Sequence, residues 1–167
     1  VDVCAPDRRN RAFETLDKGD REFLSENLPR PIDDGFESDT DNKGEKIRKT
    51  LQLLEKINYG ALLKSAKILS QLTDTEWLSD FEASMFDYHS TQPVTIQGVG
   101  GTILFTEETE AGLIIIGGRK ANHYEREAAV LIDLGGNDFY GGFPASATGN
   151  SPLSIIVDFS GNEKYSA

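Results

Sequence analysis

Hydrophobic and polar positions follow two different periods along this chain. In the first half, apolar residues recur every three or four positions, as between Glu45 and Ile57, and this spacing predicts amphipathic helices. In the second half, short β-branched runs such as GLIII and AVLID alternate with glycine turns, which is typical of strands. The change falls at Pro93. The pattern predicts an α+β chain, with a helical segment over residues 1–92 and a β-repeat segment over residues 93–167.

The helical segment is predicted to hold four helices. Three of them are expected over residues 17–27, 45–57 and 61–72, and the fourth follows Thr73. An acidic connector that contains glycine and proline, residues 29–44, separates the first two. The fourth helix carries a stripe that is more typical of a packed core than of a ligand site: Trp77, Phe81, Met85 and Tyr88.

One phrase occurs twice in the β-repeat segment. Residues 129–140 (AVLIDLGGNDFY) return as residues 154–165 (SIIVDFSGNEKY), which is a shift of 25 positions. A fainter copy runs from residue 112 to residue 124, and in our alignment Ile115 takes the place of Asp133. Because a fixed period is typical of stacked repeats, we predict a parallel β-solenoid with the helical segment packed on its first coils. An antiparallel meander is the alternative.

The strands of the repeat carry apolar residues at successive positions. Ile132 and Leu134 would lie on one face, and Leu131 on the other face with Asp133. Runs that are apolar on both faces predict burial on both sides, as in parallel sheets. The helical segment is expected to cover one of these faces.

The repeated acids are the candidate site. Stacked repeats would place Asp133 on Asp158 and Asp138 on Glu163, about 4.8 Å apart. Like charges at that distance repel by roughly 1–4 kcal/mol, so something must offset the repulsion. One candidate is Ca²⁺ held by these four carboxylates and the turn carbonyls. The other is hydrogen bonding of Asp133 and Asp158 to the N–H groups of their own glycine turns, with Asp138 and Glu163 solvated, and we favour it.

Two further pairs are expected to form ladders between the repeats. Asn137 would stack on Asn162, and Tyr140 on Tyr165. Ladders of identical side chains stabilise parallel stacked strands, so we assign these residues a structural role.

Composition narrows the classes of partner. The net charge is −11, from 17 basic and 28 acidic residues, which argues against binding a phosphate backbone. No apolar run is long enough to span a membrane. The single cysteine, Cys4, excludes an internal disulfide. Together with a start at Val1 rather than methionine, it suggests a processed piece of a precursor.

The stretch LIDLGGNDFYGG (131–142) resembles the repeats of poorly characterised bacterial exported proteins. It is also loosely similar to the calcium-binding, glycine- and aspartate-rich repeats of RTX proteins. The resemblance covers roughly residues 112–165. It implies export to the periplasm, the cell surface or the medium, an extended β-solenoid, and no known activity.

These observations predict a structural or binding component of an exported bacterial assembly, with Ca²⁺ as the candidate stabilising ion. We expect its last strand to be continued by another chain, the remainder of the same precursor. The alternative is a subunit or fragment of a carbohydrate- or peptide-active enzyme completed by another chain. In that case Asp133 and Asp158 could approach the roughly 5–5.5 Å separation of the carboxyl pair in retaining glycosidases.

Overall fold

The computed structural model describes residues 12–27, 40–88, 96–109, 111–142, 144 and 153–166. These residues form two compact units that divide between Lys64 and Ser65, inside helix α4 (Tyr59–Leu69). The first unit is helical, and the second contains a short helical stretch and all the strands. The chain is therefore mixed α+β, as its two periods predict. The expected junction at Pro93 lies outside the described residues.

The first unit is built on α1 (Lys18–Asn27) and α3 (Thr40–Glu55). Its core consists of three buried leucines, Leu16, Leu24 and Leu53. Helix α1 begins where the Asp17 carboxylate accepts the amide of Asp20 at 2.8 Å. The predicted connector, residues 29–44, ends too late, because α3 already begins at Thr40. The preceding part of that connector, up to residue 39, lies outside the described residues.

Two side-chain caps set the starts of the next helices. The Asn58 side chain accepts the amide of Ala61 at 3.0 Å near the start of α4. A short 3₁₀ helix, η1 (Ser70–Thr73), follows, and α5 (Thr75–Ser84) begins after Asp74. The Asp74 carboxylate accepts the amides of Glu76 and Trp77 at 3.1 and 3.0 Å. The polar residue before each helix therefore satisfies amides that the helix leaves free.

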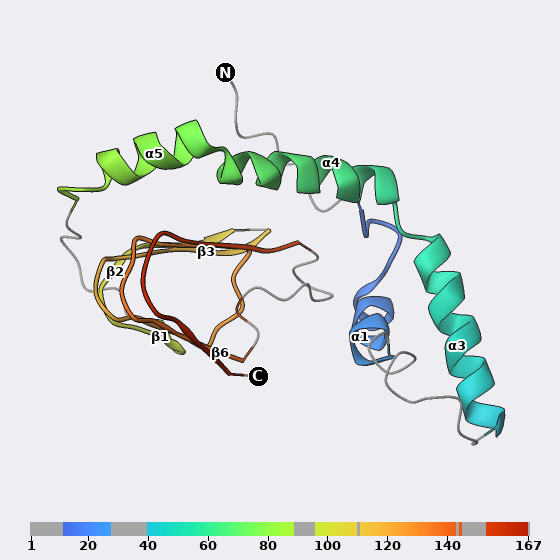
Figure 1. Cartoon of the computed structure of the whole chain (residues 1–167). Coiled ribbons are helices and arrows are strands. Elements are labelled where there is room, and N and C mark those ends of the chain that lie inside the picture. Colours follow the sequence, from blue (N-terminus) through green and yellow to red (C-terminus); the bar gives the residue numbers. More distant parts are fainter. Residues whose placement is uncertain are drawn as a thin grey trace. The chain divides into compact units, whose positions relative to one another are not determined.

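The strands form two four-stranded sheets. The first has the order β1 (Val99–Gly100), β4 (His123–Tyr124), β6 (Phe139–Gly141) and β8 (Lys164–Ser166). The second has the order β2 (Ile103–Thr109), β3 (Gly112–Gly117), β5 (Val130–Asp133) and β7 (Ile155–Asp158). From β3 onward the chain alternates between the sheets, as the yellow-to-red trace in Figure 1 shows. We call β3–β4, β5–β6 and β7–β8 the first, second and third repeats.

The pairing of successive repeats is parallel and in register. Asp133 pairs with Asp158 in β5 and β7, and Tyr140 pairs with Tyr165 in β6 and β8. Both equivalences were predicted from the repeated phrase and are confirmed, and the antiparallel alternative is wrong for these strands. Within the described sheets, antiparallel pairing occurs only where the first repeat meets the strands that precede it: β1 pairs with β4, and β2 pairs with β3.

The main core lies between the two sheets. Ile115 and Leu131 are fully buried there beside Tyr124 and Tyr140, which come from the opposite sheet. The other face of β5 is also buried, at Ile132, so the predicted burial of both faces is confirmed.

We expect Ile115→Ala to lower the free energy of unfolding by about 2–5 kcal/mol, because it leaves a cavity in this core. The matched control is Ile68→Ala in α4, where the isoleucine is 58% exposed, and its effect should stay within about 0.5 kcal/mol. Urea unfolding followed by the fluorescence of Trp77, the single tryptophan, measures both. Equal losses in the two variants would contradict the placement of the core.

Candidate functional site

Tyrosine hydroxyls bond the repeats to one another through aspartates. The Tyr124 hydroxyl of the first repeat donates to Asp133 Oδ2 of the second. The Tyr140 hydroxyl of the second repeat donates to Asp158 Oδ2 of the third at 2.7 Å. The rings also stack, with centroids 5.2 Å apart for Tyr124 and Tyr140 and 4.9 Å for Tyr140 and Tyr165. The predicted tyrosine ladder is thus confirmed, and it carries a polar bond at each described step between repeats.

Each aspartate of this ladder is also held by its own glycine turn. Asp133 Oδ1 accepts the amide of Gly135 at 2.7 Å, and Asp158 Oδ1 accepts the amide of Ser160 at 3.2 Å. Gly135 has φ 122°, a backbone conformation that favours glycine. The hydrogen-bonded interpretation of the two aspartates is therefore confirmed.

The prediction that Asp138 is a solvated turn acid is wrong. Its side chain is only 2% exposed, and its Oδ1 accepts the amide of Asn122 at 2.6 Å. The turn brings the acid against the backbone of the preceding repeat, which sequence spacing alone does not show. Glu163, at the same position of the third repeat, is half-buried rather than fully solvated, and its Oε1 is buried with no hydrogen-bond partner among the described residues.

Three of the four predicted metal ligands converge. One carboxylate oxygen from each of Asp133, Asp138 and Asp158 lies within 4.8 Å of the other two. Glu163 does not belong to this group of described residues. The cluster is interior, because Asp133 and Asp138 are buried and Asp158 is half-buried.

Burial governs the protonation of the site. Loss of solvent raises the pKa of Asp133 to about 6, although hydrogen bonds from Tyr124, Gly135 and Asn122 oppose the rise. Burial also raises the pKa of Asp138. Burial and the adjacent carboxylates raise the pKa of both Tyr124 and Tyr140, so these phenols stay protonated and act as donors.

Sequence reasoning missed two residues of the site, Asn122 and Gly117. The Asn122 amide nitrogen donates to Asp133 Oδ2 and to the Gly118 carbonyl, each at 2.9 Å. Gly117, rather than Ile115 as we aligned it, pairs with Asp133. A Cβ at Gly117 would overlap the Tyr124 hydroxyl, so this position has room for glycine alone. Counting back from Tyr124, as one counts from Tyr140 to Asp138, would have found Asn122.

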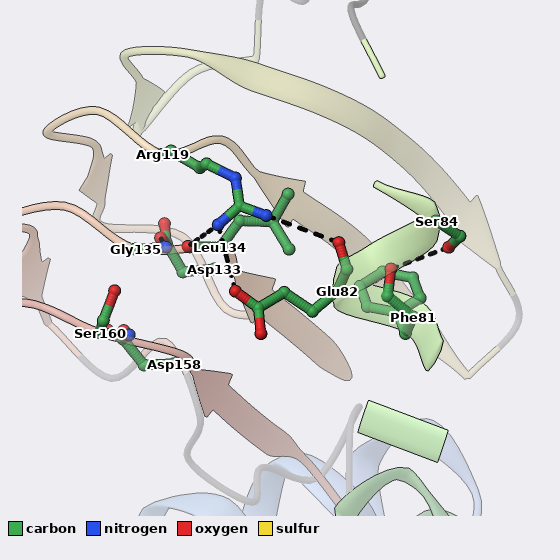
Figure 2. Close-up of polar contacts among 9 residues, drawn as sticks. All are labelled: Phe81, Glu82, Ser84, Arg119, Asp133, Leu134, Gly135, Asp158 and Ser160. Carbon is green, nitrogen blue, oxygen red and sulfur yellow. Dashed lines mark hydrogen bonds and ion pairs between the residues drawn. The ribbon is translucent and has the colours of Figure 1, made fainter. Parts of the chain in front are cut away.

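Arg119 connects the strands to α5. Its guanidinium lies 3.2 Å from the Glu82 carboxylate and 3.5 Å from the Leu134 carbonyl (Figure 2). Phe81 of α5 stacks on Phe159, with centroids 6.5 Å apart. These contacts place α5 beside the turns that follow β5 and β7. The expected cover of a sheet face by the helical segment stays a prediction.

The geometry does not favour a catalytic pair. Asp133 has no exposed surface and already accepts three hydrogen bonds, so a sugar could not reach it. A hollow of about 640 Å³ lies elsewhere, at the junction of α4, η1 and α5. The acid that lines it, Asp74, is engaged in capping α5.

No protein-family model, curated protein or solved structure matches this chain. Among the described residues, no helix combines the length and the apolar character needed to cross a membrane.

Removing the Tyr124 hydroxyl should destabilise the second unit. We expect Tyr124→Phe to lower the free energy of unfolding by about 1–3 kcal/mol, because it takes a donor from a buried carboxylate. The control is Tyr165→Phe, whose ring is 66% exposed, and it should change stability by less than about 0.5 kcal/mol. Urea unfolding measures both, and a cost for Tyr165→Phe equal to that of Tyr124→Phe would contradict the ladder.

The raised pKa of Asp133 predicts a pH dependence of stability. The folded chain retains this proton up to about pH 6, whereas the ordinary aspartate value is 3.8. The contribution of Asp133 to stability is therefore largest below about pH 4, falls as the pH rises to about 6, and is constant above. The total fall is on the order of 2–3 kcal/mol.

The measurement is urea unfolding of the parent and of Asp133→Asn between about pH 4 and 7, without divalent cations. The variant loses hydrogen bonds at every pH, but its stability should decline less than that of the parent as the pH rises. Parallel stability curves for the two proteins would rule out a raised pKa at Asp133.

Proposed function

We propose that the second unit forms the opening coils of a parallel β-solenoid that acts as a structural or binding component of an assembly. Its third repeat is continued by a β-strand segment of another polypeptide. The observation that carries this proposal is Tyr165, which occupies the donor position of the ladder, is 66% exposed, and has no acceptor among the described residues. We propose that this assembly is exported, because its repeats resemble those of bacterial exported proteins.

The exposure of successive repeats supports an unfinished stack. In the second repeat, Leu131 and Tyr140 are 0% and 1% exposed. The equivalent residues of the third repeat, Ile156 and Tyr165, are half-buried and exposed. No described strand pairs with the outer side of β7 or β8, so both sheets end in open edges. Open edges of parallel strands are sites at which another strand can add.

The ladder specifies the chemistry of the partner. Tyr124 and Tyr140 each donate to an aspartate of the following repeat. A segment that pairs in parallel with β7 would therefore need an aspartate aligned with Asp158, within reach of the Tyr165 hydroxyl. It would also need β-branched residues to cover Ile156. A segment with the phrase of residues 154–165 meets both requirements.

The test uses a synthetic peptide with the sequence of residues 153–166, LSIIVDFSGNEKYS, as the added strand segment. We expect the peptide to bind the full chain and to slow amide hydrogen exchange in β7 and β8. Tyr165→Phe should weaken this binding about tenfold, because one hydrogen bond to a carboxylate contributes on the order of 1.4 kcal/mol.

The matched control is the same peptide with asparagine in place of its aspartate, which should bind the parent about tenfold more weakly. Slow exchange in β7 and β8 without any peptide, equal to that in β5, would contradict an open edge. Equal binding of the peptide by the parent and by Tyr165→Phe would contradict the proposed acceptor.

A further inference from the structure

Asn122, Asp138 and Glu163 occupy one position in successive repeats. Each lies two residues before the tyrosine of its repeat, and these tyrosines pair in register through β4, β6 and β8. The backbone bonds agree, because the Phe139 amide donates to the Asn122 carbonyl and the Lys164 amide donates to the Asp138 carbonyl, at 3.0 and 2.8 Å. The three repeats thus carry an amide, a short acid and a longer acid at the same place.

Between the first and second repeats, this position supplies a hydrogen-bond donor. The Asn122 amide donates to Asp133 Oδ2 at 2.9 Å, which satisfies both groups in a buried site. Its own oxygen accepts the amide of Thr102 at 2.7 Å. The first step of the stack is therefore closed by ordinary hydrogen bonds.

Between the second and third repeats, a carboxylate takes the place of that amide. Asp138 Oδ1 accepts the Asn122 amide, but Oδ2 is buried and no described residue donates to it. The acid of the next repeat, Asp158, offers a carboxylate oxygen within 4.8 Å of an oxygen of Asp138. An ionised carboxylate has no donor, so the bond made by Asn122 cannot form here. Either a proton on one of these acids or a bound cation must occupy its place, because a buried oxygen without a partner is costly.

The remaining lone pairs suit a cation with oxygen ligands. Asp138 Oδ2 has its full accepting capacity, and Asp133 Oδ1 and Asp158 Oδ1 each accept one backbone amide. Oxygens on opposite sides of one Ca²⁺ are about 4.6–5.2 Å apart, whereas those on Mg²⁺ are about 4.0–4.2 Å apart. The three carboxylate oxygens lie within 4.8 Å of one another, which is close enough for all three to contact one Ca²⁺.

We propose that Asp133, Asp138 and Asp158 bind one Ca²⁺ between the second and third repeats, with Asp138 Oδ2 as the ligand that has no other partner. The ion would link the carboxylates of the second and third repeats, as the hydrogen bond from the Asn122 amide links the first repeat to the second. The site lies within a single chain, so it does not depend on the partner proposed above.

The sequence itself supplies the decisive variant, Asp138→Asn, which places the amide of the first repeat in the second. We expect CaCl₂ to raise the unfolding temperature of the full-length parent above its value in EDTA. Asp138→Asn should unfold at a higher temperature than the parent in EDTA, and calcium should shift it little. The control Glu107→Gln also removes one negative charge, from the exposed surface of β2, and should respond to calcium as the parent does.

Binding is measured separately with Tb³⁺, whose emission is excited through nearby tyrosine rings. Tyr140 bonds directly to Asp158, so the parent should give sensitised emission that Ca²⁺ displaces, and Asp138→Asn should lose at least tenfold in affinity. This readout needs no change in stability. Absence of sensitised emission from the parent, or an equal loss of calcium response in Glu107→Gln and Asp138→Asn, would overturn the site.

Discussion

The structure of the second unit depends on a buried hydrogen bond from a tyrosine of one repeat to an aspartate of the next. Stacking Asp133 on Asp158 would by itself be unfavourable, since two like charges share one column of a parallel sheet. Each acid is instead paired with a phenol from the preceding repeat and an amide from its own glycine turn. The same tyrosine rings stack as a column and fill the space between the sheets. Each of these tyrosines thus donates a hydrogen bond to a carboxylate and also packs in the core.

The repeats share the same backbone pairing but differ in the charge of the side chains at equivalent positions. The first repeat carries Gly117 and Asn122 where the second carries Asp133 and Asp138 and the third carries Asp158 and Glu163. Negative charge therefore enters the interior only after the first repeat, and with it the need for a proton or a cation. Burial alone would favour the proton, as the raised pKa values of Asp133 and Asp138 indicate.

The sequence predicted the mixed α+β class and the pairing of the second and third repeats because these signals are local or periodic. The two apolar periods distinguish helices from strands, and the phrase at 129–140 and 154–165 fixes the register of four strands. It also identified three acids that converge. It did not predict the burial of Asp138 or the roles of Gly117 and Asn122, because these depend on how a turn folds against the previous repeat. Non-local contacts of this kind, like that of Arg119 with α5, leave no spacing signal.

Gly117 gives the stack a polarity. It stands at the aspartate position of the first repeat, where the Tyr124 hydroxyl takes up the space that a side chain would need. This position can therefore never accept a bond from a tyrosine on the side of β2, and β2 runs antiparallel to β3 there. The ladder therefore lacks an acceptor on the side of β2, whereas on the side of β7 the exposed Tyr165 supplies a free donor position. An array of such repeats would have a defined origin and a single direction of growth, set by one missing side chain.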